Sequence, residues 1–270
     1  MFLFYFFLIS LFSIVDAQQL IKQDGSPVEI YADEAIEWHK NDNKYIAIGN
    51  AKAKSGSMVL KSDKIEAFYD ESDDSAMDIR LVKAHRRVKI IDNKLEITGG
   101  NLAEYNLKKD HFSIFGKDLI LTSEKNKLKS TNKMEYWRQK GVAIATGNAT
   151  AIKENEFIIK AEKLIWYINE INNKMDVKKI LGFNNVSIRS NNEVAFSDKA
   201  LYNRISGICK LFGNVKLQRG TSFLTGDYAE MDLNKGISKL MPAPGRDSLN
   251  ENRVRALIDK GENYDTKKPN

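Results

Sequence analysis

Residues 57–65 read SMVLKSDKI, and the pattern in this short stretch decides the fold. Met58 and Leu60 lie five and three residues before Asp63, so an alternation of period two places both on one face of a strand. Ile65 lies two residues after Asp63, so the apolar face changes phase there. Because a bend or β-bulge produces such a change, the stretch predicts a strand that bends at Asp63.

The same pattern recurs along the chain at intervals of about 30 residues, which is the spacing of repeat-built folds. Each copy has an anchor pair whose first residue is small. The anchor pairs are Ala32-Asp33, Ser62-Asp63, Gly99-Gly100, Thr131-Asn132, Ala161-Glu162, Ser197-Asp198 and Gly226-Asp227. Two residues after each pair comes an apolar residue: Ala35, Ile65, Leu102, Met134, Leu164, Ala200 or Ala229. The repeat therefore predicts a series of similar bent strands.

Three further landmarks lie between the anchor pairs. Gly49-Asn50, Gly147-Asn148 and Gly213-Asn214 each precede another alternating run, and we interpret them as turns between strands. No window after the N-terminal segment shows a long helical period. The fold class predicted from these patterns is all-β, a repeat-built antiparallel stack of roughly 16 to 20 short strands.

The N-terminal residues predict export. The run 2–15 is apolar and ends close to Ala17, as in a secretory signal peptide spanning residues 1–17. A helix of that length covers about 21 Å, less than the roughly 30 Å hydrocarbon core of a bilayer. No Lys or Arg precedes the run and Asp16 is unusual near a cleavage site, so a retained membrane anchor stays an alternative. Removal of residues 1–17 takes the formal net charge from +6 to +7 by deleting Asp16, which suits anionic partners.

The rest of the chain is predicted to form one β-repeat domain over residues 27–258. Two stacked half-units that meet near Gly147 are the alternative division. The run 253–258 is interpreted as a last edge strand, with a short amphipathic helix as the alternative. Residues 259–270 are polar and are predicted to be a disordered tail.

Several of these segments resemble the LptA/OstA-like family of periplasmic lipopolysaccharide-transport proteins. The matching segments are 27–33 (PVEIYAD), Gly49-Asn50 with 57–65, and the similar units 147–164 and 213–233. The resemblance covers residues 27–258 and implies a rolled sheet, described as a β-taco or jelly-roll-like fold, with an open apolar groove. It also implies binding of the lipid A part of lipopolysaccharide and head-to-tail assembly. A membrane-anchored partner (LptC-like) and the periplasmic part of the outer-membrane translocon share such motifs.

We therefore expect a periplasmic protein that bridges the inner and outer membranes and relays lipopolysaccharide through the groove. The residues expected to line it are Val28, Ile30, Met58, Leu60, Leu95, Ile97, Phe157 and Ile159, with a closed, ligand-free core as the alternative. The expected partners are lipopolysaccharide, through its acyl chains, and the inner-membrane-anchored and outer-membrane translocon proteins of the same β fold. Self-association is expected through edge strands near 27–31 and 253–258.

The sequence predicts no catalytic centre, no cofactor and no metal site. His39, His85 and His111 fall in different repeats without metal-ligand spacing, and each is expected at the surface. Cys209 is the single cysteine, so no intrachain disulfide can form, and it is expected to pack as a small apolar residue. A polysaccharide-active solenoid enzyme would need clustered acidic residues on adjacent strands. A nucleic-acid-binding role is disfavoured by the export signal and by the lack of clustered Lys and Arg. A structural envelope protein with the same fold is the main rival, and bound lipid would exclude it.

Overall fold

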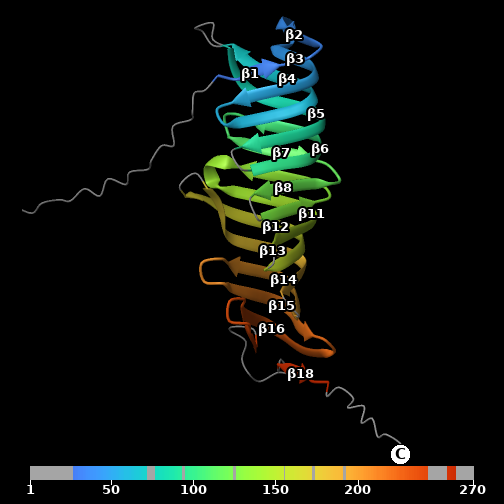
Figure 1. Cartoon of the computed structure of the whole chain (residues 1–270), viewed down its shortest axis with the longest axis vertical. Coiled ribbons are helices and arrows are strands. Elements are labelled where there is room, and N and C mark those ends of the chain that lie inside the picture. The colour runs from blue at the N-terminus through green and yellow to red at the C-terminus, as the bar shows by residue number, and fades with distance from the viewer. Residues whose placement is uncertain are drawn as a thin grey trace, which may run out of the picture.

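The computed structural model describes residues 27–71, 77–92, 95–123, 126–154, 156–171, 174–190, 193–242 and 254–259. Within them the chain forms 18 strands joined in one antiparallel sheet, together with two short 3-10 helices. The strands stack along the long axis of the molecule, from β1 and β2 at one end to β18 at the other (Figure 1). The predicted signal peptide or anchor (1–17) and the tail beyond Asp259 lie outside the described residues. In the part that is described, no helix is long and apolar enough to cross a membrane.

The first elements are β1 (Glu29–Tyr31), β2 (Ala35–His39), η1 (Lys40–Asp42), β3 (Lys44–Ser55), β4 (Met58–Glu71), β5 (Met77–Asp92), β6 (Leu95–Asn106), β7 (His111–Phe115), β8 (Leu119–Ser123) and β9 (Asn126–Ser130). They continue with β10 (Lys133–Trp137), η2 (Arg138–Lys140), β11 (Val142–Lys153), β12 (Phe157–Ile171), β13 (Lys174–Ser190), β14 (Glu193–Asn203), β15 (Ile208–Arg219), β16 (Ser222–Asp232), β17 (Ile237–Met241) and β18 (Arg255–Leu257). The strand count lies within the predicted range.

A line of β-bulges folds this sheet lengthwise. Gly49 and Asn50 of β3 lie opposite the single residue Asp63 of β4, where the register of the two strands shifts. Their φ angles are 82° and 40°, a region that Gly and Asn enter more readily than most residues. Equivalent pairs with positive φ interrupt β5, β11, β13 and β15: Arg86-Arg87, Gly147-Asn148, Asn184-Asn185 and Gly213-Asn214. Because each bulge bends its strand, the sheet has two halves.

We call these halves arm A and arm B. Arm A contains β1, β8, β9 and β18 and the parts of the longer strands on their side of the bulges. Arm B contains β2, β7, β10 and β17 and the opposite parts of the same long strands. Each long strand therefore contributes to both arms.

The predicted change of phase at the anchor pairs is confirmed. In β4, Leu60 is buried before the bulge and Ile65 after it, so the inward face shifts by one residue at Asp63. Two details were wrong: Leu102 faces outward while its neighbour Ala103 is buried, and Ala35 is exposed. In β4 the anchor Asp63 itself lies opposite the bulge. In β6 the residue opposite the bulge Arg86-Arg87 is Asn101, one residue after the anchor Gly100.

The interpretation of the Gly-Asn pairs as turns between strands was also wrong. Gly147-Asn148 lies in the middle of β11, which pairs with β12 on both sides of the bulge. Tight hairpin turns and the bulges seen here both use residues with positive φ, so the same two residue types, Gly and Asn, suit either one. The sheet continues without a break past Gly147, and the boundaries 27–258 of a single domain stay a prediction.

The interior lies between the two arms, where inward-facing side chains from both form one hydrophobic cluster. Cys209 belongs to it and is fully buried, as predicted. The last apolar run does form a strand, since β18 pairs with β16 through Leu257 and Phe223. The alternating pattern thus produces a folded sheet with an apolar inside and a charged outside.

Candidate functional site

The residues predicted to line a groove all lie on or beside arm A. Six of them are buried in the shared cluster: Met58, Leu60, Leu95, Ile97, Phe157 and Ile159. Ile30 in β1 is partly buried and packs against that cluster, and Val28, just before β1, is also partly buried. The structure therefore brings these residues to one face of one arm, which forms half of the interior.

Arm B supplies the other half, and the sequence reasoning did not name its residues as groove lining. They include Ile65, Tyr69, Tyr105, Phe112, Trp166, Ile180 and Tyr202, which are all buried. The signal that could have identified them is the apolar position two residues after each anchor pair, continued in steps of two along the strand. Ile65 and Tyr69 follow that rule in β4.

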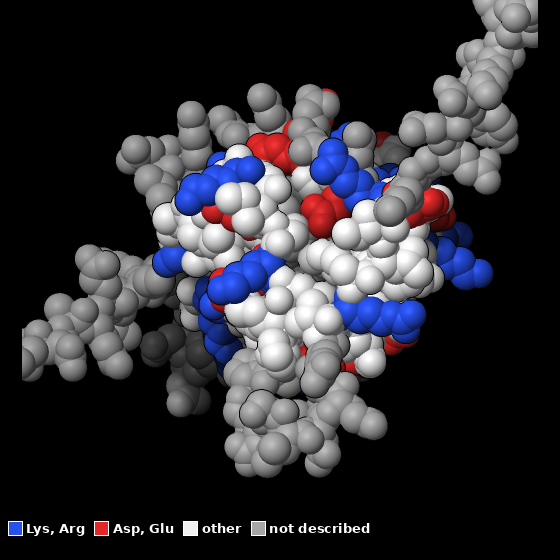
Figure 2. Space-filling model, turned by 90° about the horizontal axis from the view of Figure 1, so that it is seen from below, with Lys and Arg blue, Asp and Glu red and all other residues white. Residues whose placement is uncertain are grey.

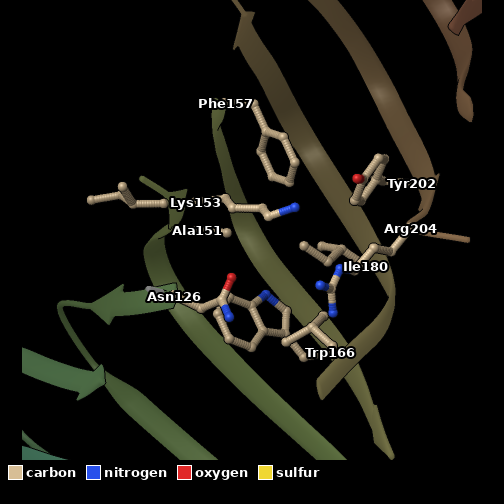
Figure 3. A pocket seen from close by; sticks show the side chains of 10 residues that line it. Asn126, Ala151, Lys153, Phe157, Trp166, Ile180, Tyr202 and Arg204 are labelled. Carbon is tan, nitrogen blue, oxygen red and sulfur yellow. The ribbon is translucent and has the colours of Figure 1, made fainter. Parts of the chain in front are cut away.

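A recess of about 270 Å³, counted with its open side, lies between the arms near the middle of the molecule. Arm A lines it with Asn126, Ala151, Ile152, Lys153 and Phe157, and arm B with Trp166, Val177, Ile180 and Tyr202, joined by Arg204 after β14 (Figure 3). Much of this volume is open to solvent. The recess has apolar and aromatic walls with three polar side chains at its edge.

The two arms touch across the open side of this recess. The rings of Phe157 and Tyr202 meet edge to face with their centroids 4.8 Å apart. Burial, followed by the nearby Glu156 carboxylate, raises the pKa of Tyr202 to about 12, so the phenol is neutral at physiological pH. An aromatic pair of this kind is worth about 0.5–1.5 kcal/mol beyond its buried area. The contact joins the two arms without a covalent or ionic bond between Phe157 and Tyr202.

A second connection between the arms is ionic and lies closer to the N-terminus. Asp92, at the arm A end of β5, accepts a hydrogen bond of 2.7 Å from Ser57 Oγ. Its other oxygen, Oδ2, lies 3.4 Å from Nε of Arg138, which follows arm B strand β10. Burial alone would lower the pKa of Arg138, but the carboxylates of Asp92 and Asp110 raise it above its ordinary value. The pair holds the arms together by charge.

Further along, Ser238 Oγ in β17 donates to Glu193 Oε1 in β14 over 3.2 Å. Glu193 belongs to arm A and Ser238 to arm B. Among the described residues, side-chain contacts therefore join the free edges of the two arms at three heights, near Asp92, Phe157 and Glu193. Side chains alone make these contacts, so parting the arms there would break no pair of the β-sheet ladder.

The histidines do not gather at this site. His39 and His85 are partly exposed and each contacts a glutamate, Glu37 and Glu66 respectively. His111 was expected at the surface but is largely covered, because its ring stacks on Trp137 with centroids 3.8 Å apart. Among the residues that the structure describes, no group of His, Cys, Asp and Glu side chains could hold a metal ion.

The comparisons with known proteins place the chain in a family. No curated protein matches the sequence. The crystal structure of LptH, described as the LptA homologous periplasmic component of the lipopolysaccharide transport device of Pseudomonas aeruginosa, is 10% identical. That match covers 88% of this chain and 98% of LptH, with a TM-score of 0.23, too low to show a common overall shape. The family model for the LptA/LptD N-terminal domain matches residues 29–140 and again residues 130–237. Since these two matches span most of the chain, the protein belongs to the LptA/LptD N-terminal domain family of lipopolysaccharide-transport proteins.

Proposed function

We propose that the protein binds the acyl chains of lipopolysaccharide between its two arms and relays the lipid across the periplasm. The observation that carries this proposal is a single apolar cluster that runs between the arms and is closed on one side by side-chain contacts alone. The predicted lining residues on arm A, with their counterparts on arm B, would form the groove. The family assignment supports the choice of lipopolysaccharide as the lipid.

The energetics suit a relay. Burial of each CH₂ group is worth about 0.8 kcal/mol, so a twelve-carbon chain gains on the order of 10 kcal/mol on leaving water. The donor and acceptor are themselves membranes or apolar grooves, so the net free energy of each transfer is small. The protein then needs no energy source of its own, and direction comes from other components.

Bridging is proposed to occur through the two ends of the sheet. At one end, β1 and β2 form an edge that exposes Tyr31, Ile36 and Trp38. At the other end, beside β17 and β18, Ile237 is 60% exposed and Ile258 is 76% exposed. Figure 2 looks toward this second end, where much of the visible surface is uncharged and charged side chains of both signs are scattered among the uncharged residues.

An edge strand offers unpaired N–H and C=O groups to a partner strand. We propose that a second copy, or an inner-membrane-anchored or outer-membrane partner of the same β fold, extends the sheet at these ends. A membrane-anchored role of this chain itself, or a purely structural role in the envelope, are the alternatives. The proposal places the protein in the periplasm, as the resemblance to its family suggests.

Native mass spectrometry of the purified protein with lipopolysaccharide tests the binding step. The matched control ligand is the same saccharide after removal of the acyl chains. We expect complexes with the intact lipid and none with the deacylated saccharide. Equal binding of the two ligands would show that the acyl chains are not what the protein recognises.

A further inference from the structure

The recess contains a buried hydrogen-bond donor that the binding of acyl chains does not explain. Trp166 is 2% exposed, and among the described residues its indole Nε1 has no hydrogen-bond acceptor. Figure 3 shows the indole nitrogen turned into the space between Asn126, Lys153 and Arg204. A buried donor without an acceptor costs about 1–3 kcal/mol, so its position calls for an explanation.

Two cationic side chains, Lys153 and Arg204, line the recess together with that donor. Lys153 follows Ala149 and Ala151 in steps of two along β11, so it shares their inward face. Arg204 follows the inward-facing Tyr202 in the same way on the opposite arm. The amide of Asn126 on β9 adds a further polar group. Donors therefore converge on the recess from both arms.

The charge of Lys153 is partly compensated in this structure. Its ammonium group forms an ion pair with the carboxylate of Glu156, in the turn between β11 and β12. Glu156 is about half exposed, so the carboxylate can move into solvent while Lys153 keeps its place beside the recess. A ligand with its own negative charge would then replace Glu156 as the partner of Lys153.

The apolar walls of the same recess lead into the main cluster. Phe157 and Val177 line the recess and also belong to the cluster that contains Ile159. A ligand that places an anionic group beside Trp166 could therefore extend an apolar chain from this point into the space between the arms.

We infer that the recess at Trp166 binds an acidic headgroup, namely an oxyanion such as a phosphate monoester or carboxylate attached to an acyl chain. The oxyanion accepts hydrogen bonds from Trp166 Nε1, Lys153 and Arg204, and the chain lies between the arms. Charge-assisted hydrogen bonds are the strong ones in such a setting. This inference rests on the proposed lipid-binding function. It adds that the groove prefers lipids with an anionic headgroup and holds that headgroup at one position, the recess at Trp166.

Isothermal titration calorimetry with four probes, each at a concentration at which it is dissolved as a monomer, tests the inference. The probes are dodecyl phosphate, dodecanoate, 1-dodecanol and inorganic phosphate. We expect both anionic amphiphiles to bind about ten-fold more tightly than 1-dodecanol, with little binding of inorganic phosphate. Inorganic phosphate binding as tightly as dodecyl phosphate would overturn the inference, because the site would then recognise a free anion.

Variants separate the headgroup site from the groove. Trp166→Phe keeps an aromatic side chain but removes the donor, and Lys153→Gln removes the cation, so each should weaken dodecyl phosphate binding by about three- to ten-fold. Glu156→Gln should strengthen it, since Lys153 loses its competing partner. Lys160→Gln, an exposed lysine on the outer face of the same arm, is the matched control and should change nothing.

The inference fails if dodecyl phosphate and 1-dodecanol bind equally, or if neither Trp166→Phe nor Lys153→Gln changes the affinity for dodecyl phosphate. Binding of 1-dodecanol in those cases would leave the proposed lipid-binding function standing. Absence of binding by every amphiphile would instead contradict both the inference and the proposed function.

Discussion

Asn214 Nδ2 donates a hydrogen bond of 2.9 Å to Asp198 Oδ2 across the line where the sheet folds. Asn214 is the second residue of a bulge in β15, and Asp198 belongs to the anchor pair of β14. The same relationship joins Asn50 to Asp33, Arg87 to Asp63 and Asn185 to Glu162 at 2.8, 2.5 and 2.9 Å. The repeat in the sequence is thus a repeat of the corner between the arms, where a bulge residue binds the preceding anchor.

Glycine at position 213 relieves strain in the corner. Gly213 has a φ of 75°, and a Cβ atom added there would lie 2.4 Å from Asp198 Oδ2. Gly213→Ala should lower the free energy of unfolding by about 2–3 kcal/mol, from backbone strain and this clash together. Gly220→Ala is the control, since its φ is 60° but nothing lies within 4 Å of an added Cβ. Urea denaturation should show the smaller loss at Gly220, and equal losses would mean that the contact with Asp198 does not matter.

The single thiol should be unreactive in the folded protein. Cys209 is fully buried, and burial raises its pKa to about 12. Because the thiolate is the reactive form, we expect no labelling by a maleimide at pH 8 until denaturant is added. Rapid labelling of the native protein would show that the arms open widely at Cys209 without unfolding.

Stability should decline in mild acid because of His111. Burial lowers the pKa of His111 below its ordinary value of 6.5, despite the nearby Glu135 carboxylate. The unfolded chain therefore takes up the proton before the folded protein does, so stability is undiminished above pH 6.5 and falls as the pH drops toward the folded pKa.

The measurement is the free energy of unfolding between pH 7.5 and pH 5, taken for the native sequence and for His111→Gln. The difference between the two proteins should shift in favour of His111→Gln as the pH falls across this range. A constant difference across the range would exclude His111 as the titrating group.

The aromatic contact at the recess should control the exchange of lipid. Phe157→Ala removes the ring that meets Tyr202, so a fluorescent acyl probe should leave the protein several-fold faster. Phe196→Ala is the control, because Phe196 is an exposed aromatic residue in arm A of the same sheet. Stopped-flow dilution gives both rates, and an unchanged rate for Phe157→Ala would show that lipid does not pass this contact.

The sequence predicts the repeat, the bend at most of the anchor pairs and the buried face of arm A, because these depend on residues close together in the chain. The contacts across the arms could not be predicted in this way. Phe157 and Tyr202 lie in different strands, and only the folded sheet brings their rings together. Lys153 and Arg204 look like ordinary charged residues near strand ends. A sequence signal for Lys153 did exist: it lies two residues after Ala151 and four after Ala149, so it points to the same face of the strand. That signal does not identify a binding partner.

Photocrosslinking in cells tests the central claim that lipid lies between the arms. A photoreactive residue would replace Ile159, which is buried and faces inward, or its neighbour Lys160, which faces outward on the same strand. A second pair, Leu60 and Lys61, repeats the comparison on β4. We predict lipopolysaccharide adducts at Ile159 and Leu60 and none at the two lysine positions. Absence of adducts at both inward positions of a folded, exported protein would contradict the account and favour a structural role in the envelope.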